Sequence, residues 1–375
     1  MHETQKTVVV CPLDWGLGHA TRMVPVIELL LRFGARVVIA ADNRPLAFLK
    51  QRFPEGIFEK LPGYTPKYPR YGALMPLVLM TNYPLMMMKA RAAQNLLLRI
   101  VKKYQAGIVI SDNRYELSIP GVYSIFVTHQ LHIQTNGWQK LFKSFITSNI
   151  KAYLNRYDEV WIPDFAGTPN LSGMLSHPPI NIKLKQSYVG LLSRFAQINC
   201  SPGHPGYDIV VLISGPEPQR SLLENKLTKQ ALSLDIKALI IKGQPENSEE
   251  YQQGNVHFLS HANDHQIAEF IAGAGLVISR PGYSTLMDLA FLQKKAACIP
   301  TPGQTEQLYL ANKLMEEKMA YCDSQKNFNL QHAFETRNLY TGLPLFQHDD
   351  TLQMTINRIL TQQLLPKKEV PDERR

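Results

Sequence analysis

Four turns, each directly after a short apolar run, carry the side chains best able to do chemistry. The first turn, residues 12–21, places Gly16, Gly18 and His19 just ahead of an amphipathic helical pattern. Glycines let a strand turn sharply into a helix and leave backbone amides open to a ligand, and the helix N-terminus favours an anion. A histidine there can act as a general base near neutral pH. We interpret His19 either as such a base or as a residue that only caps the helix.

The same turn matches the fingerprint of a dinucleotide-binding site only in part. That fingerprint needs a third glycine or an alanine where this chain has Thr21. Asp42, at the end of the next apolar run, does stand where an acid that binds a ribose would stand. An NAD site therefore remains an alternative to a site for a phosphorylated ligand.

The second turn, residues 279–288, combines a cation with the start of a helix. Arg280 follows an apolar run, and Ser284 is of the type that caps a helix N-terminus. Asp288 lies one turn into the helix, where it could contact a ribose or simply favour the positive end of the helix dipole. The residues of this turn that we predict to bind a phosphorylated ligand are Arg280, Gly282, Tyr283, Ser284, Thr285 and Asp288.

The third turn, residues 300–307, crowds amide and acid side chains onto the entrance of another helix. Gln304, Glu306 and Gln307 suit sugar hydroxyls, because each hydroxyl both donates and accepts hydrogen bonds. The alternative is a loop that only caps the helix.

The fourth turn, residues 213–220, is small and contains a glycine. Ser214 and Gly215 stand ahead of Arg220, so that this loop could hold a phosphate. An ordinary surface turn explains the same residues equally well.

A further polar cluster follows the apolar run that ends at residue 111. Asp112, Asn113 and Arg114 are candidates for contact with a second substrate, together with Asp14 of the first turn. An ion pair between Asp112 and Arg114 on the surface is the alternative interpretation.

Strands and helices must place these turns. Short apolar runs alternate with longer helical patterns, which is typical of an α/β fold with parallel sheets. The predicted strands span residues 7–11, 36–41, 107–111, 124–128, 159–163, 208–213, 238–242, 256–259, 275–279 and 296–300. The predicted helices include residues 20–33, 219–233, 264–272, 284–292 and 306–317.

A stretch rich in proline and glycine, residues 193–207, interrupts this alternation. We therefore expect two Rossmann-like domains that face each other across a cleft. The first spans residues 1–192 and the second residues 208–348, with 193–207 as the linker. Residues 349–375 are expected to form a C-terminal helix, which could return to the first domain, and a disordered charged tail.

The amino-acid composition limits the classes of binding partner that we expect. Among 375 residues, 45% are hydrophobic and 19% charged, which excludes a disordered or fibrous chain. The net charge of +9 suits a polyanionic partner, namely nucleic acid, an anionic membrane or a phosphorylated substrate. The basic residues are not gathered in one tract and no nucleic-acid motif is present, so that nucleic acid is not expected. The four cysteines are widely spaced, and we expect no metal site and no disulfide.

Residues 64–103 mix apolar side chains with basic ones, which suits docking on an anionic membrane but also ordinary core packing. The polar residues 1–7 run directly into an apolar strand, which is not the pattern of a signal peptide. No apolar stretch approaches the ~20 residues of a spanning helix. We expect a cytoplasmic protein, either free or at the inner face of the cell membrane.

Together and in this order, the four turns resemble those of the GT-B glycosyltransferases, most closely the MurG-like group of family 28. The resemblance covers residues 7–314 and is most specific over residues 279–312. Members carry a Gly-Gly-His turn where this chain has residues 16–19. They also carry an Arg-Ser-Gly turn ahead of an acidic ribose ligand, where this chain has residues 280–282 and Asp288.

Two other segments extend the resemblance. A glutamine-rich loop that binds the sugar in the family is matched by residues 304–307. Residues 127–130 are similar to a His-Glu-Gln-Asn stretch on the acceptor side of the family, which makes His129 and Gln130 acceptor-site candidates.

The resemblance implies an inverting transfer of a hexose or N-acetylhexosamine from a UDP-sugar to a hydroxyl group, without a cofactor or a metal ion. His19 would deprotonate the acceptor, which is lipid-linked in the MurG-like group. Arg280 or Arg220 and helix N-termini would neutralise the leaving diphosphate. Asp288 would bind the ribose, and residues 304–307 the sugar ring.

Two other functions stay open. A sugar-nucleotide epimerase of GT-B fold would use similar diphosphate and ribose contacts without an acceptor. A non-catalytic nucleotide-binding protein would need only the basic charge and the turns.

Overall fold

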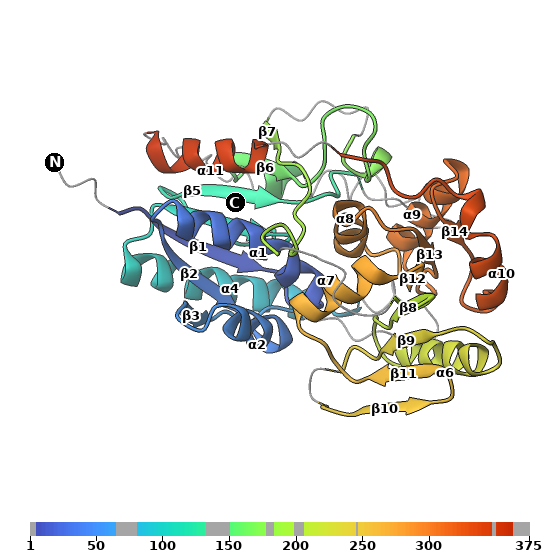
Figure 1. The fold of residues 1–375 in the computed structure, drawn as a ribbon. Coiled ribbons are helices and arrows are strands. Elements are labelled where there is room, and N and C mark those ends of the chain that lie inside the picture. Colours follow the sequence, from blue (N-terminus) through green and yellow to red (C-terminus); the bar gives the residue numbers. More distant parts are fainter. Residues whose placement is uncertain are drawn as a thin grey trace. The chain divides into compact units, whose positions relative to one another are not determined.

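The computed structural model describes residues 5–64, 81–132, 151–177, 184–198, 206–244, 247–346 and 350–362. Contacts divide these residues into two compact units. Unit 1 contains the described residues up to 192 together with 350–362, and unit 2 contains those from 193 to 346 (Figure 1). Residues 199–205 of the predicted linker, 65–80 of the mixed apolar and basic stretch, and 363–375 of the predicted C-terminal helix and tail lie outside the described residues.

Unit 1 is built on a sheet whose strands all pair in parallel. Its seven described strands lie in the order β3-β2-β1-β4-β5-β6-β7. They are β1 (Thr7–Pro12), β2 (Arg36–Ala41), β3 (Ile57–Lys60), β4 (Ile108–Asp112), β5 (Tyr123–Val127), β6 (Glu159–Ile162) and β7 (Lys185–Tyr188).

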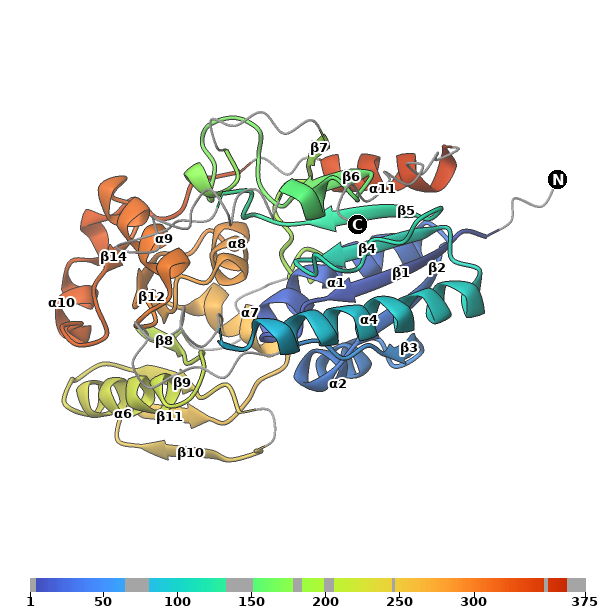
Figure 2. The same ribbon diagram turned by 180° about the vertical axis from the view of Figure 1, so that it is seen from behind.

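The helices of unit 1 bury the apolar runs of this sheet. They are α1 (Leu17–Arg32), α2 (Asn43–Arg52), α4 (Tyr83–Tyr104) and α11 (Thr351–Thr361), with the 3-10 helix η3 (Gly173–Leu175). Val9 and Cys11 of β1 form a core cluster with Leu97 and Ile100 of α4. Figures 1 and 2 show α4 and α1 running along the same strands in both views.

The C-terminal helix α11 belongs to unit 1, although it is the last element of the chain. Its Arg358 donates to the buried Glu159 of β6 at 2.6 Å, and Lys6 donates to the carbonyl oxygen of Ile359 at 3.1 Å. These polar contacts, together with the fully buried Ile356 and Ile359, anchor the helix.

Unit 2 has a second sheet, in the order β10-β11-β9-β8-β12-β13-β14 among the described strands. The strands are β8 (Ile209–Leu212), β9 (Ala238–Ile241), β10 (Glu250–Gln253), β11 (Val256–Leu259), β12 (Leu276–Ser279), β13 (Ala296–Cys298) and β14 (Tyr321–Cys322). Among the strands that the structure describes in this unit, only β10, at one edge, pairs antiparallel.

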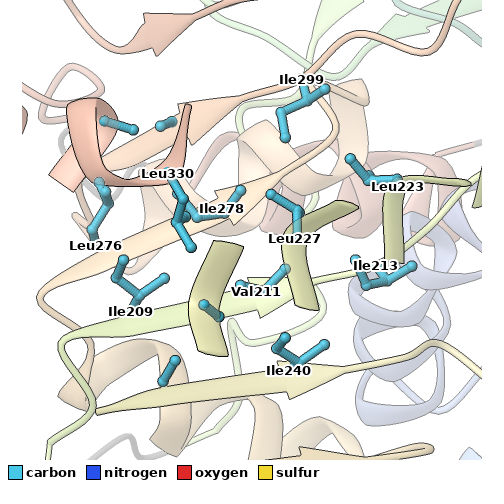
Figure 3. Packing of buried hydrophobic residues seen from close by; sticks show 14 of the residues in the cluster. Ile209, Val211, Ile213, Leu223, Leu227, Ile240, Leu276, Ile278, Ile299 and Leu330 are labelled. Carbon is cyan, nitrogen blue, oxygen red and sulfur yellow. The ribbon is translucent and has the colours of Figure 1, made fainter. Parts of the chain in front are cut away.

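The helices of unit 2 are α6 (Gln219–Leu232), α7 (Asp264–Gly273), α8 (Tyr283–Phe291), α9 (Thr305–Glu316) and α10 (Leu330–Glu335), with the 3-10 helix η4 (Arg337–Leu339). Figure 3 shows how the core is made: Ile209 and Val211 of β8 point to the same side as Leu276 and Ile278 of β12, and Leu227 of α6 packs onto them. Both halves of the chain thus fold as α/β units with parallel-dominated sheets, and the predicted fold class is confirmed.

No helix in the part of the chain that the structure describes is both long and apolar enough to cross a membrane.

Candidate active site

In each unit the candidate residues gather where the strand order reverses. In unit 1 the reversal lies between β1 and β4, and in unit 2 it lies between β8 and β12. Open α/β sheets bind ligands outside the carboxyl ends of the strands at such a switch point.

In unit 1, the histidine of the first turn meets an aspartate from the neighbouring strand. His19 lies in the first turn of α1, and its Nδ1 is 3.0 Å from Oδ2 of Asp112, the last residue of β4. The N-cap of α1 is Gly16, so that the alternative role of His19 as the helix cap is wrong. Because the side chain of His19 remains 20% exposed while Asp112 is fully buried, the imidazole can still reach a substrate.

Arg22 holds the same carboxylate. Its Nε donates to both oxygens of Asp112 at 3.0 and 2.9 Å, and its Nη2 also contacts Oδ1. Although burial alone would raise the pKa of Asp112, the positive charge of Arg22 and the hydrogen bonds from His19 and Arg22 hold that pKa below its ordinary value. Asp112 is therefore ionised and can only accept, which places the imidazole hydrogen on Nδ1 and leaves Nε2 of His19 free to take a proton.

Burial lowers the pKa of His19, and the positive charge of Arg22 lowers it further, against the opposing effect of Asp112. The imidazole is thus neutral near pH 7, which is the form that a general base requires.

The predicted acceptor-site residues divide into two groups. His129, which follows β5, is buried and lies with Nδ1 2.9 Å from Nη1 of Arg22, so that the structure brings it to His19 and Asp112. Gln130 follows it and is partly exposed. Asn113 has a positive φ of 54°, and its side-chain Oδ1 is buried without a partner among the described residues.

Arg114 and Asp14 form the other group, which holds a neighbouring loop. Arg114 is 1% exposed and donates to the carbonyl oxygens of Leu61 and Pro62 and to Glu116. A Cβ on Gly63 would lie 3.0 Å from Oδ1 of Asp14, so that the loop after β3 packs directly on this pair. The burial of Arg114 and of Asp112 argues against direct contact with an acceptor and favours a supporting role, and their predicted ion pair is absent.

In unit 2, Arg280 is a buried cation that has no carboxylate partner among the described residues. It is 2% exposed, and its guanidinium donates only to the carbonyl oxygens of Ile299, Pro300 and Gln219 and to Oε1 of Gln325. Burial lowers its pKa to about 10, so that it is still charged at neutral pH. Since a buried charge without a counter-ion is costly, this arrangement favours an anionic ligand.

Nε of Arg280, the donor atom of the guanidinium that remains unsatisfied, lies beside Gly215 of the fourth turn. Nε of Arg280 has no partner in the described chain, and neither do the hydroxyl groups of Thr301 and Ser279. A Cβ on Gly215 would lie 3.7 Å from Oγ1 of Thr301 and 3.8 Å from Nε of Arg280. The loops that follow β12 and β13 therefore bring two unsatisfied groups, Nε of Arg280 and the hydroxyl of Thr301, beside Gly215 of the loop that follows β8.

Three helices begin at these loops without a side-chain cap. The N-caps are Pro218 for α6, Gly282 for α8 and Gln304 for α9, and none of them accepts a hydrogen bond through its side chain. By contrast, Asn263 caps α7 with a complete capping box. The predicted cap at Ser284 is wrong, because α8 begins one residue earlier, at Tyr283. Uncapped N-termini leave amides available to an anion, except that in the first turn of α6 the N–H of Ser221 donates to Glu217 at 3.3 Å.

Asp288 is already engaged. It accepts from Oγ of Ser193 at 2.8 Å and from Nε of Arg194 at 3.1 Å, while Nη1 of Arg194 donates to Asp264 at 3.0 Å. Burial raises the pKa of Asp288 to about 6. Its contact with a ribose stays a prediction. Arg194 is not among the predicted site residues, and its signal in the sequence is a lone cation at the start of the predicted linker.

The structure also places the other residues that we predict to bind the nucleotide-sugar. Gln307 accepts from the backbone N–H of Thr301 at 2.8 Å and so shapes the third turn, while Gln304 and Glu306 are partly exposed at the start of α9. Arg220 contacts Glu217 at 2.6 Å and Glu224 at 2.8 Å, so that its charge is compensated inside the unit. Arg280 is therefore the better anion ligand of the two.

No group of three or more His, Cys, Asp or Glu side chains in the described ranges could hold a metal ion.

Comparisons with known proteins agree with this arrangement. Residues 217–338 match the family model of the glycosyltransferase family 28 C-terminal domain. No curated protein sequence matches the chain.

Three solved structures illustrate the fold. Spinosyn rhamnosyltransferase SpnG has a TM-score of 0.60 at 13% identity, with 95% of each chain covered. MurG of Acinetobacter baumannii has a TM-score of 0.56 at 13% identity, over 96% of this chain and 100% of that one. UGT89C1 of Arabidopsis thaliana, complexed with quercetin, has a TM-score of 0.57 at 14% identity, over 95% and 94%. At such identities the likeness concerns the fold. The chain therefore has a GT-B fold, and residues 217–338 of its second unit match the glycosyltransferase family 28 C-terminal domain, a match that supports sugar transfer as the class of reaction.

Proposed function

We propose that this glycosyltransferase moves a hexose or N-acetylhexosamine from a UDP-sugar to a hydroxyl acceptor, with inversion and without a metal ion. The observation that carries the proposal is the buried Arg280, whose Nε is unsatisfied beside Gly215 in the family 28 domain. A diphosphate supplies both the negative charge and the acceptors that this guanidinium lacks.

In the proposed reaction, Nε2 of His19 takes the proton of the acceptor hydroxyl while Asp112 holds Nδ1–H. The acceptor oxygen bonds to the anomeric carbon, and the bond between that carbon and the phosphate oxygen breaks. The electron pair stays on the leaving diphosphate, which Arg280 and the uncapped N-termini of α6, α8 and α9 stabilise. Because these fixed charges neutralise the leaving group, the proposed step requires no metal ion. A single displacement of this kind inverts the anomeric configuration.

The acceptor is proposed to be lipid-linked, with the protein cytoplasmic and docked on the inner face of the membrane. Helix α4 supports this part of the proposal: Tyr83, Leu85 and Met88 are exposed, and the helix carries five basic residues and no acidic one. Leu97 and Ile100 of the same helix are core residues. The start of α4 therefore fits membrane docking, and its later part fits core packing.

The first test is a thermal-shift panel with UDP, GDP, ADP, TDP and NAD. A ligand at 100 times its Kd adds about 2.7 kcal/mol, which is a shift of a few degrees at this size. We expect UDP alone to raise the Tm of the wild type. In Arg280→Lys we expect the Kd for UDP to rise about 10- to 100-fold, because a bonded planar guanidinium is lost. Arg337→Lys, an arginine of the same unit that donates to the carbonyl oxygen of Phe334, is the matched control.

The second test concerns turnover. His19→Gln is expected to keep the thermal shift with UDP and to lose about 10²- to 10⁴-fold in turnover. Release of UDP from a UDP-sugar only when an acceptor hydroxyl is present identifies a transferase, whereas interconversion of sugars without an acceptor identifies an epimerase. A rise in Tm with NAD and with no diphosphate would overturn the proposal.

A further inference from the structure

Arg22 contacts both of the other charged or titratable groups that face His19 in the part of the chain that the structure describes, Asp112 and His129. It lies on α1, three residues after His19, and therefore on the same side of the helix. Its guanidinium is 1% exposed. It reaches Asp112 at the end of β4 through Nε and Nη2, and His129 after β5 through Nη1 at 2.9 Å. The three elements at the switch point of unit 1 thus meet on one side chain.

The orientation of Asp112 depends on this contact. Nε of Arg22 donates to both carboxylate oxygens, at 3.0 and 2.9 Å, so that the plane of the carboxylate is fixed relative to α1. Oδ2, one of these two oxygens, is the atom that accepts from Nδ1 of His19. A carboxylate free to rotate in a buried site would hold the imidazole less firmly, since only one of its oxygens is in contact with His19.

The charge of Arg22 has a separate effect. A buried carboxylate beside a histidine favours the imidazolium and so weakens the imidazole as a base at neutral pH. Arg22 opposes this effect, because it is a cation near both groups. The groups that face His19 are Arg22 on its own helix, Asp112 on β4 and His129 after β5. His129 accepts from Arg22 through Nδ1, which requires that this nitrogen carries no proton.

We propose that Arg22 is a positioning residue of the transfer reaction, which orients Asp112 toward His19 and keeps the imidazole in its neutral, proton-accepting form. This inference rests on the proposed function, in which His19 is the base. The role that it assigns to Arg22 goes beyond the hydrogen bond between His19 and Asp112. It also lies outside the family 28 match, which begins at residue 217.

The experiment uses the full-length protein with ¹⁵N-labelled histidine. The titration of His19, identified with His19→Gln, is followed by NMR in the wild type, Arg22→Met, Arg22→Gln and Arg22→Lys. The same variants are assayed for kcat/KM against pH. The control is Arg358→Lys, because Arg358 also donates to a buried carboxylate in unit 1, at Glu159.

In the two neutral variants we expect the pKa of His19 to rise and the acid limb of the kcat/KM profile to move to higher pH by the same amount. In Arg22→Lys the charge remains, so that the titration should stay near that of the wild type. Its kcat should fall at least about 10-fold with KM little changed, because the bidentate contact is lost. Arg358→Lys should lower the Tm and leave the titration, kcat and the pH profile unchanged.

A wild-type titration of His19 in a folded neutral variant would overturn the inference. If both neutral variants fail to fold, an Arg22→Lys variant with wild-type kcat would overturn it as well. The NMR titration needs no substrate. If the pKa of His19 rises in the neutral variants but turnover does not change, the proposed role of His19 as the base has failed, while the effect of Arg22 on the imidazole stands. The failure of the proposed function and the failure of this inference can therefore be told apart.

Discussion

Two buried arginines differ in their counter-ions, and this difference separates the two sites. Arg22 is neutralised inside unit 1 by Asp112. Arg280 has hydrogen-bond acceptors around it but no carboxylate in the described chain, and its Nε is unsatisfied. A paired guanidinium can orient and tune its neighbours, whereas an unpaired one stabilises an incoming anion. At the scale of residues, these roles suit base activation and diphosphate binding.

Asp288 gives a prediction at the same scale. Burial raises its pKa from 3.8 to about 6, so that between about pH 4 and pH 6 the folded state binds more protons than the unfolded state. Stability therefore falls as pH rises through this window. Asp288→Asn has no carboxyl group at this position, so that its stability should not fall in this window. The free energy of unfolding of the variant minus that of the wild type should therefore increase by about 3 kcal/mol from pH 4 to pH 7.

Urea unfolding of both proteins across this range measures the difference. Glu316→Gln, which removes an exposed carboxylate from α9, is the control for a general effect of charge. If the curves of the wild type and Asp288→Asn run parallel, the carboxylate of Asp288 is not strained by burial, and Arg194 compensates it fully.

At the scale of elements, the helix starts distinguish the ligand edge of unit 2 from the rest of the unit. Helices α6, α8 and α9 follow β8, β12 and β13 without side-chain caps, while α7 and α10 are capped by Asn263 and Asn329. Caps contribute about 0.5–2 kcal/mol each. Three helices without them at one edge are consistent with amides left free for a ligand.

Gly215 tests this edge. Its φ of +114° and the closeness of Thr301 and Arg280 mean that Gly215→Ala adds strain and places a methyl group where we propose the diphosphate to bind. We expect a loss of about 1–3 kcal/mol in stability and a reduced thermal shift with UDP. Gly254→Ala, at a φ of +56° with open space around it, should lower the Tm but keep the shift with UDP. Equal responses of the two variants to UDP would contradict this assignment.

At the scale of the whole molecule, the net charge is +9, and α4 contributes to it because the helix carries five basic residues and no acidic one. Lys89 and Arg91 follow the exposed Met88 in the sequence of that helix. Basic residues near an anionic membrane contribute about 1 kcal/mol each. The double variant Lys89→Gln/Arg91→Gln should therefore bind anionic vesicles about 30-fold more weakly than the wild type.

Sedimentation with phosphatidylglycerol-containing vesicles, compared with phosphatidylcholine vesicles, measures this binding. Lys229→Gln/Lys326→Gln removes the same charge from unit 2 and should have little effect if α4 is the docking surface. Binding that is absent in the wild type would remove the membrane from the proposed function and leave sugar transfer untouched.

The central strands and the candidate turns could be predicted from the sequence because each depends on neighbours along the chain. An apolar run such as residues 8–11 must be buried on both faces, and a glycine turn after it must lead to a helix. The strands that were missed are β3, β7, β10 and β14, and all four lie at the edges of the two sheets. An edge strand has one partner and is partly exposed, so that its sequence is short and its apolar run is interrupted or missing, as in β7 and β10.

The sequence by itself therefore determined the α/β class, the central strands and the turns that carry His19 and Arg280. Only the tertiary structure decided which side chains meet. Asp112 lies 93 residues from His19, and Arg194 lies 94 residues from Asp288. Strand order brings these pairs together, and strand order is set by how the helices pack on the sheet rather than by local propensity. Spacing along the chain therefore revealed the chemical groups, and the fold assigned their partners.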